Sequence, residues 1–303
     1  MRPRKSRRLR IALLQERAAP ETRAVICDVG ANPLHPPPYA IAMETGAVDV
    51  VGFEPQREAY EALVAEAREN EIYVNAALGR TGAATLRIYP SGGLTSLFPL
   101  KRAALRWLGK FEAQPDLVTE ATMELTALDD CAEVPPVDLL KIDIQGGERD
   151  VIASGRGKLA GAVCVIPEVR YYQLYEGEPT LAELDAELRD QGFVLHKFLP
   201  AIRTMVPNSQ AHRLDPGANR NQLIDGDAVY IRPLETPETL SDDQLKKMAL
   251  FAAAVFNSHD LCLHCLDLLV ARGVVDADVP AAYVDLLPED MIRQPRRRRA
   301  AAE

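Results

Sequence analysis

Short apolar segments alternate with amphipathic segments from Arg23 onwards, and this alternation limits the fold more than any other feature of the chain. Apolar runs of this kind are typical of parallel strands that are covered by helices. The pattern therefore predicts an α/β fold, with a Rossmann-like, mostly parallel sheet and helices on both faces. We expect strands at residues 24–29, 48–53, 73–78, 84–89, 137–144, 162–169, 193–196 and 228–231.

Helical periodicity fills the intervals between these strands. Residues 56–70 place their apolar side chains on one face, and Thr180 and Glu183 form a capping box that begins a later helix. After Pro233 the period is helical, which predicts an appended hairpin at 241–273. The expected parts are a basic N-terminal segment at 1–20, a Rossmann-like domain at 21–235, a C-terminal helical extension at 236–290 and a basic tail at 291–303.

Charge is distributed unevenly along the 303 residues. Residues 1–10 carry six Lys or Arg, and residues 293–303 carry five Arg and one Glu, so the net charge of −9 leaves −19 for residues 11–292. So acidic a body repels nucleic-acid phosphates. We therefore interpret the basic ends as solvated, mobile tails, and we do not expect a nucleic-acid partner.

The composition, 47% hydrophobic and 26% charged, is ordinary for a soluble globular protein. No apolar run is long enough for a membrane span, so we expect no membrane partner. The five cysteines are odd in number and lie mostly in apolar segments. This favours reduced thiols in a cytoplasmic protein over a disulfide framework.

Polar residues and glycine close three of the predicted strands. Asp28 and Gly30 end the first, where a residue without a side chain lets the backbone approach a ligand. Glu54 ends the second, where a carboxylate can accept the hydroxyls of a ribose. Residues 141–148 end a central strand. Open α/β sheets bind ligands at this edge, so the three features predict a nucleotide-type site.

Two phosphate-binding alternatives fit less well. The chain contains no G-x-x-x-x-G-K-[ST] motif, and the turn after the first strand lacks the second and third glycines of a dinucleotide fingerprint. The pattern therefore disfavours a kinase and a dehydrogenase.

Five sequence blocks occur in order, at residues 28–32, 52–55, 75–79, 125–130 and 138–148. With these blocks, residues 24–200 resemble the FkbM family of methyltransferases that act on small molecules and sugars. The resemblance implies a seven-stranded class I sheet that binds S-adenosyl-L-methionine, with the methionine part near Asn32, the ribose at Glu54 and the adenine near Asn75. The residues it implies for cofactor binding are Asp28, Gly30, Ala31, Asn32, Glu54, Pro55, Asn75 and Ala76.

The chain differs from the family pattern at two places. In the family, a glycine usually follows this turn and the chain enters a helix directly, but here residues 33–38 are rich in proline. We therefore expect the helix to begin only at about Tyr39. Gln145 stands where a glutamate is common in the family. The substitution removes a candidate acid, base or metal ligand at that position.

Transfer of an activated methyl group depends mainly on aligning the acceptor oxygen and excluding water. A hydroxyl acceptor also benefits from a general base, and the candidate catalytic residues are Asp143, Glu148 and Glu168. A second interpretation of Glu148 is that it caps the helix that follows it.

No metal site is predicted. His259, Cys262, His264 and Cys265 lie close together in the sequence, but both cysteines fall on the apolar stripe of a predicted helix and the usual zinc spacings are missing. His196 lies within an apolar strand, which is typical of a structural histidine.

The leading hypothesis is O-methylation of a sugar, a glycan or another small hydroxylated metabolite. One alternative is a cofactor-binding or regulatory protein of the same fold with weakened catalysis, and another is a nucleic-acid methyltransferase anchored by its basic ends. Tyr171, Tyr172 and Tyr175 either stack on an acceptor sugar or cover the sheet edge. The C-terminal hairpin is either a homodimer surface or a cover for the sheet.

Overall fold

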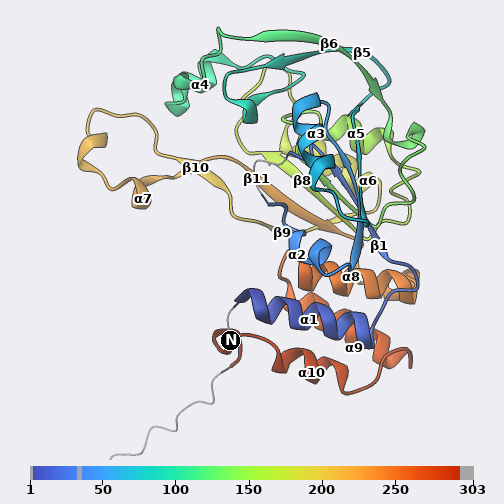
Figure 1. Ribbon diagram of the computed structural model, residues 1–303. Coiled ribbons are helices and arrows are strands. Elements are labelled where there is room, and N and C mark those ends of the chain that lie inside the picture. Colours follow the sequence, from blue (N-terminus) through green and yellow to red (C-terminus); the bar gives the residue numbers. More distant parts are fainter. Residues whose placement is uncertain (1–2, 33–35, 294–303) are drawn as a thin grey trace, which may run out of the picture. The chain divides into compact units, whose positions relative to one another are not determined.

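The computed structural model describes residues 3–32 and 36–293, and these group into two compact units (Figure 1). The sheet unit comprises residues 23–37 and 48–239. The helical unit comprises the described parts of residues 1–22, 38–47 and 240–303. The N-terminal segment and the C-terminal extension, which the sequence predicts as separate parts, therefore belong to one unit.

A mostly parallel sheet of eight strands forms the centre of the sheet unit. Its strands are β1 (Ala24–Val29), β2 (Val48–Phe53), β3 (Glu71–Val74), β7 (Leu139–Ile142), β8 (Cys164–Arg170), β9 (Val194–Phe198), β10 (Ile202–Thr204) and β11 (Gln222–Ile231). The order is β10-β11-β8-β7-β1-β2-β3, and β9 also pairs with β11. Strand β11 runs antiparallel to β8, β9 and β10, while the other pairs are parallel. The α/β class is confirmed, with eight strands instead of seven.

A second sheet of three strands consists of β4 (Ala77–Leu78), β5 (Gly82–Ile88) and β6 (Thr119–Thr126). The single strand predicted at 73–78 is divided between the two sheets, because the chain turns at Ala76, whose N–H donates to the carbonyl of Val74. Strand β6 has mostly exposed or half-buried residues, so no apolar run marks it in the sequence. Its pairing with β5 along its length stabilises it instead.

One face of the main sheet is apolar. Side chains alternate between the two faces along a strand, and α5 (Glu148–Ser154) and α6 (Leu181–Asp190) pack on the apolar face. The predicted capping box of α6 is present, with Thr180 and Glu183 bonded to each other's backbone N–H. The buried cluster on this face includes Cys27, Val29, Leu140, Ile142, Val151, Val165, Val169, Leu184, Leu188 and Tyr230.

Three further helices belong to the sheet unit: α3 (Arg57–Glu66), α4 (Arg102–Leu108) and α7 (Pro216–Asn219). The helix predicted at 56–70 ends earlier, at Glu66, because Ala67 adopts an extended backbone. Helix α7 lies on an arm between β10 and β11 that projects from the sheet (Figure 1).

The helical unit contains α1 (Pro3–Arg17), α2 (Ala40–Glu44), α8 (Asp242–Ala254), α9 (His259–Ala271) and α10 (Val279–Asp285). Helices α8 and α9 form the predicted hairpin, and Ser241 begins α8 with a capping box. Helix α2 follows Tyr39, as the prolines predict. Of the prolines in this segment, Pro33 lies outside the described residues. No helix in the described ranges is long and apolar enough to cross a membrane.

The interpretation of the basic N-terminal segment as a mobile tail is wrong for the residues from 3 onwards. Helix α1 packs against α2, α8 and α10, and Ile11 and Leu14 are fully buried. Arg4 and Arg8 form ion pairs with Glu44. A count of charge along the chain misses this, because the neutralising carboxylate is distant in sequence. Residues 294–303, most of the predicted basic tail, lie outside the described part.

Candidate active site

Four adjacent strands carry charged side chains on the face opposite the hydrophobic core. We call this set the charged row: Asp28 (β1), Lys141 (β7), Glu168 and Arg170 (β8), and Asp225 and Asp227 (β11). The pairing of β1 with β7 places Asp28 beside Lys141, and the pairing of β8 with β11 places Glu168 opposite Asp227. Since every second side chain shares a face, the row lies on one side of the sheet near the carboxyl ends of its parallel strands.

Ion pairs connect the charged row. Lys141 Nζ lies 3.2 Å from Asp227 Oδ1. Arg170 Nη2 lies 2.8 Å from Glu168 Oε2, and Nη1 lies 2.6 Å from Asp225 Oδ2. The Arg170 side chain is only 4% exposed, so these pairs are little screened by solvent.

The turn after β1 forms the first part of the predicted cofactor site. The N–H groups of Gly30 and Ala31 both donate to the carbonyl of Phe53 at 3.0 Å, and the N–H of Asn32 donates to the carbonyl of Gly30 at 2.8 Å. Gly30 has φ +88°, and a Cβ there would lie 2.1 Å from the carbonyl oxygen of Asp143. Close approach of β1 to the end of β7 therefore requires glycine, a reason that the sequence alone does not give.

Glu54 lies at the end of β2 and is 3% exposed. Its Oε1 accepts the N–H of Gln56 at 2.7 Å, and Asn75 Nδ2 donates to the carbonyls of Glu54 and Pro55 at 2.8 and 3.1 Å. Burial raises the pKa of Glu54, the N–H of Gln56 opposes this, and the charge of Asp28 adds to it. The structure therefore brings together the predicted residues of β1, β2 and the loop at Asn75.

A small apolar hollow of about 50 Å³, partly open to solvent, lies between these segments. Gly30, Phe53, Pro55, Ala76 and Ile144 contribute to its lining. A buried carboxylate beside an apolar hollow fits a ligand that joins a hydroxylated sugar to a flat ring. The residues present therefore fit a nucleoside.

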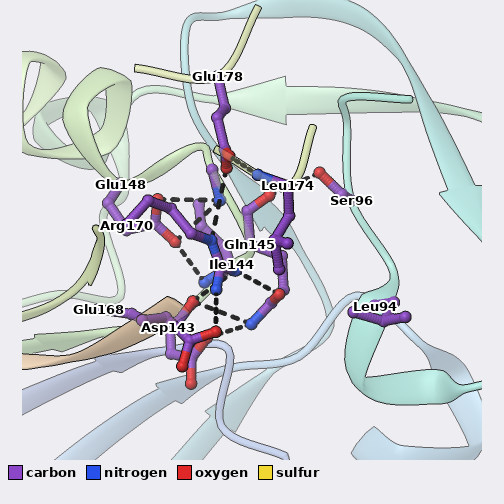
Figure 2. Close-up of polar contacts among 12 residues, drawn as sticks. Leu94, Ser96, Asp143, Ile144, Gln145, Glu148, Glu168, Arg170, Leu174 and Glu178 are labelled. Carbon is purple, nitrogen blue, oxygen red and sulfur yellow. Dashed lines mark hydrogen bonds and ion pairs between the residues drawn. The ribbon is translucent and has the colours of Figure 1, made fainter. Parts of the chain in front are cut away.

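Gln145 links the two candidate bases Asp143 and Glu168 (Figure 2). Its Nε2 donates to Asp143 Oδ1 and to Glu168 Oε2, both at 2.9 Å. Its Oε1 accepts from Arg170 and from the hydroxyl of Tyr175, the latter at 3.0 Å. Burial, followed by the charge of Asp143, raises the pKa of Glu168 well above its usual range. Position 145 thus carries an amide where the family commonly has a carboxylate, and this amide hydrogen-bonds to the carboxylates of Asp143 and Glu168.

Glu148 is 5% exposed and binds the backbone before its own helix. Its carboxylate accepts the N–H of Ile144 at 2.9 Å and that of Gly146 at 2.9 and 3.1 Å. Burial raises its pKa, and the charge of Arg170 and these N–H groups oppose the shift. These contacts hold the loop that precedes α5, and they leave the carboxylate little exposed to an acceptor.

Three carboxylates lie close enough to share an ion, since one oxygen each of Asp143, Glu148 and Glu168 lies within 4.8 Å of the others. Gln145 and two backbone N–H groups already donate to these carboxylates. An ion would have to displace those donors, so the arrangement does not favour a metal centre.

The cysteines and histidines of α9 are not arranged as ligands of a metal ion. Cys262 and Cys265 are fully buried, and burial raises the pKa of the Cys265 thiol to about 12. His259 Nδ1 lies 2.8 Å from the hydroxyl of Tyr283. Within the described residues this segment does not form a metal-binding group.

The three tyrosines after β8 differ in their exposure. Tyr175 is 1% exposed and packs into a hydrophobic cluster. Tyr171 and Tyr172 line a groove of about 830 Å³, and Tyr171 makes an edge-to-face contact with Phe198 at 5.6 Å. Tyr175 is therefore covered, whereas Tyr171 and Tyr172 border the groove.

Arg170, Asp225 and Asp227 are not among the site residues that the sequence predicts. A signal for them exists, because E-V-R in β8 and D-G-D in β11 place charges at alternate positions of otherwise apolar strands. Strand β11 begins at Gln222, six residues before the predicted start. The predicted strand therefore left out both aspartates.

A family model for the FkbM methyltransferase domain matches residues 28–195, more than half of the chain. No curated protein matches the sequence. The fold is similar to that of magnesium protoporphyrin IX methyltransferase from Synechocystis PCC 6803 with bound SAM, at 10% identity, 76% of this chain, 79% of that chain and TM-score 0.34. It is also similar to that of a TehB-like SAM-dependent methyltransferase from Corynebacterium glutamicum, at 10% identity, 74% of this chain, 87% of that chain and TM-score 0.34.

The mostly parallel sheet, with polar groups gathered at its carboxyl edge, defines a Rossmann-like α/β protein with a ligand site at that edge. With more than half of its length matched by the family model, the chain belongs to the FkbM methyltransferase family. It is accordingly an S-adenosylmethionine-dependent methyltransferase, and S-adenosyl-L-methionine is its cofactor.

Proposed function

We propose that the protein methylates a hydroxyl oxygen of a sugar, a glycan or another small hydroxylated metabolite. The observation that carries this proposal is the pair Asp143 and Glu168, held by one amide at the carboxyl edge of β7 and β8. Deprotonation of a hydroxyl acceptor in the transition state needs a carboxylate or similar base at this edge.

The cofactor-binding residues we propose are those of the first two strand ends and the Asn75 loop. Glu54 would accept the ribose hydroxyls, and the apolar hollow beside Ala76 would take the adenine ring. The proposed set is Asp28, Gly30, Ala31, Asn32, Glu54, Pro55, Asn75 and Ala76.

The cofactor supplies a methyl group that its sulfonium has already activated, so the residues of the chain have to hold the acceptor, exclude water and accept one proton. Asp143 is partly exposed and is the carboxylate we propose as the proton acceptor. Glu168, 11% exposed, would take the proton from the site in a later step. Glu148 would fix the backbone of the loop that carries Asp143 and Gln145.

The first test is cofactor binding, measured by calorimetry with S-adenosyl-L-homocysteine. Glu54→Gln should weaken binding by about tenfold or more, because a hydrogen bond to a charged group contributes about 1.5–3 kcal/mol. Glu58→Gln changes an exposed carboxylate of α3 and serves as the matched control. Equal affinities for the two variants would contradict the proposed role of Glu54.

The second test separates the enzyme from a binding protein that lacks turnover. Purified protein is incubated with S-adenosylmethionine and a panel of hydroxylated acceptors, and products are searched for a mass gain of one CH2 unit. Asp143→Asn should reduce the rate by about 10²-fold or more, as expected for loss of a general base. Cofactor binding without any methylated product would favour the binding protein.

A further inference from the structure

We propose that Gln145 is a positioning residue for methyl transfer, which orients Asp143 and keeps a further negative charge away from the pair Asp143 and Glu168. The inference rests on the proposed function, because it names a residue that prepares the base. Gln145 itself touches no reacting atom in this scheme.

The amide of Gln145 uses both of its N–H groups and accepts twice at its oxygen. Asp143 and Glu168 accept from Nε2, while Arg170 donates to Oε1 (Figure 2). The hydroxyl of Tyr175 also donates to Oε1. Carboxylates offer only acceptors and the guanidinium only donors, so this network admits one orientation of the amide. Arg170 also pairs with Glu168, so the guanidinium, the amide and both acids form one connected network of hydrogen bonds and ion pairs.

The backbone of Gln145 is held in a conformation that a side chain normally disfavours. Its φ is +61°, in the left-handed region. A glycine would adopt this conformation without strain, so the interactions of the side chain and backbone have to offset it. Ser96 Oγ adds one of them by donating to the carbonyl of Gln145 at 2.6 Å. Strain maintained by surrounding contacts is typical of functional sites.

The neutrality of the amide matters because the neighbouring acids already oppose one another. The charge of Asp143 adds to burial in raising the pKa of Glu168, and the charges of Glu148 and Asp225 act in the same direction against Arg170. Glutamate at position 145 would replace two donors with a further carboxylate. Asp143 would then lose a hydrogen bond to its charged form and gain a repulsive neighbour.

The experiment is an NMR titration of the full chain labelled with ¹³C at the aspartate side-chain carboxyls. Asp143→Asn identifies the Asp143 signal. In Gln145→Glu the Asp143 carboxyl should titrate about one pH unit or more above its position in the unmodified protein. Gln145→Met has the length of glutamine without charge or donors, and should shift the midpoint in the same direction by less. This second variant keeps the test valid if Gln145→Glu does not fold.

Gln191→Glu is the matched control, because the Gln191 amide donates to the Ile152 carbonyl and to Glu187, away from the acid pair. It should leave the Asp143 midpoint unchanged. The proposal is overturned if neither Gln145 variant moves that midpoint, or if Gln191→Glu moves it equally. The titration needs neither cofactor nor acceptor, so its failure is distinct from a failure of cofactor binding or methylation in the earlier tests.

Discussion

Glu168 illustrates how a single residue in the sheet combines burial with charge. It lies on β8 with Arg170 at 2.8 Å, the amide of Gln145 at 2.9 Å and Asp227 opposite on β11. Burial is the largest cause that raises its pKa, the charge of Asp143 follows, and Arg170 opposes both. The folded protein therefore binds a proton at Glu168 more tightly than the unfolded chain does.

This raised pKa predicts how stability depends on pH. Below about pH 4.3, the ordinary glutamate pKa, Glu168 is protonated in both states and its contribution is fully present. As pH rises towards the folded-state pKa, the unfolded chain loses the proton first, so the free energy of unfolding falls. Glu168→Gln removes this loss, and urea unfolding should show its stability relative to the unmodified protein increasing as the pH is raised above about 4.3.

An exposed carboxylate provides the comparison for that measurement. Glu61→Gln alters an exposed partner of Arg57 on α3, and its effect on stability should be small throughout that pH series. Parallel pH profiles for the two variants would contradict the assignment of the raised pKa to Glu168.

At the scale of elements, the ends of β1 and β7 fix the geometry of the edge that carries the site. The carbonyl of Asp143 lies where a Cβ of residue 30 would be, and the N–H of Asp143 donates to the carbonyl of Val29 at 3.0 Å. The backbone atoms of the two strand ends are thus in direct contact. Any side chain at residue 30 would separate Asp28 from the Asp143 loop.

Gly30→Ala tests this contact, and Gly177→Ala is its control. Both glycines have positive φ, +88° and +77°, but a Cβ at Gly177 meets nothing within 4 Å. Gly177→Ala should reduce the free energy of unfolding by about 1–2 kcal/mol through backbone strain alone. Gly30→Ala should reduce it by about 3 kcal/mol or more, because β1 or β7 must move. Equal losses in chemical denaturation would argue against the clash.

At the scale of the whole molecule, segments distant in sequence assemble each unit. The helical unit joins α1 near the N-terminus, α2 after the first strand, and α8 to α10 near the end of the described chain. Arg17 of α1 pairs with Asp278 at 2.8 Å, and the Ser6 hydroxyl donates to the carbonyl of Leu286. The basic N-terminal helix is therefore part of a packed core.

Ile11→Ala tests whether α1 is structural. Ile11 is fully buried, so the substitution should lower the free energy of unfolding by about 2–5 kcal/mol. Leu9 is 39% exposed on the same helix, and Leu9→Ala should change it by about 0.5 kcal/mol or less. Thermal unfolding of the full chain measures both. If Ile11→Ala is as mild as Leu9→Ala, the helix does not stabilise the unit.

Several features of the protein follow from its sequence alone. The strands at 24–29 and 48–53, the capping box at Thr180 and the α8–α9 hairpin are encoded by residues within a few positions of one another. Local periodicity and capping need no distant partner. Glu54 at the end of a strand follows from the same local pattern.

Only the tertiary structure decided which charges meet. Asp225 reaches Arg170 because β11 inserts antiparallel beside β8, and the bond of Gln145 to Glu168 spans the gap between two strands. The same holds for α1, whose charges are neutralised by Glu44. Pairing between segments tens of residues apart depends on the summed packing of the fold, which no local pattern of residues records.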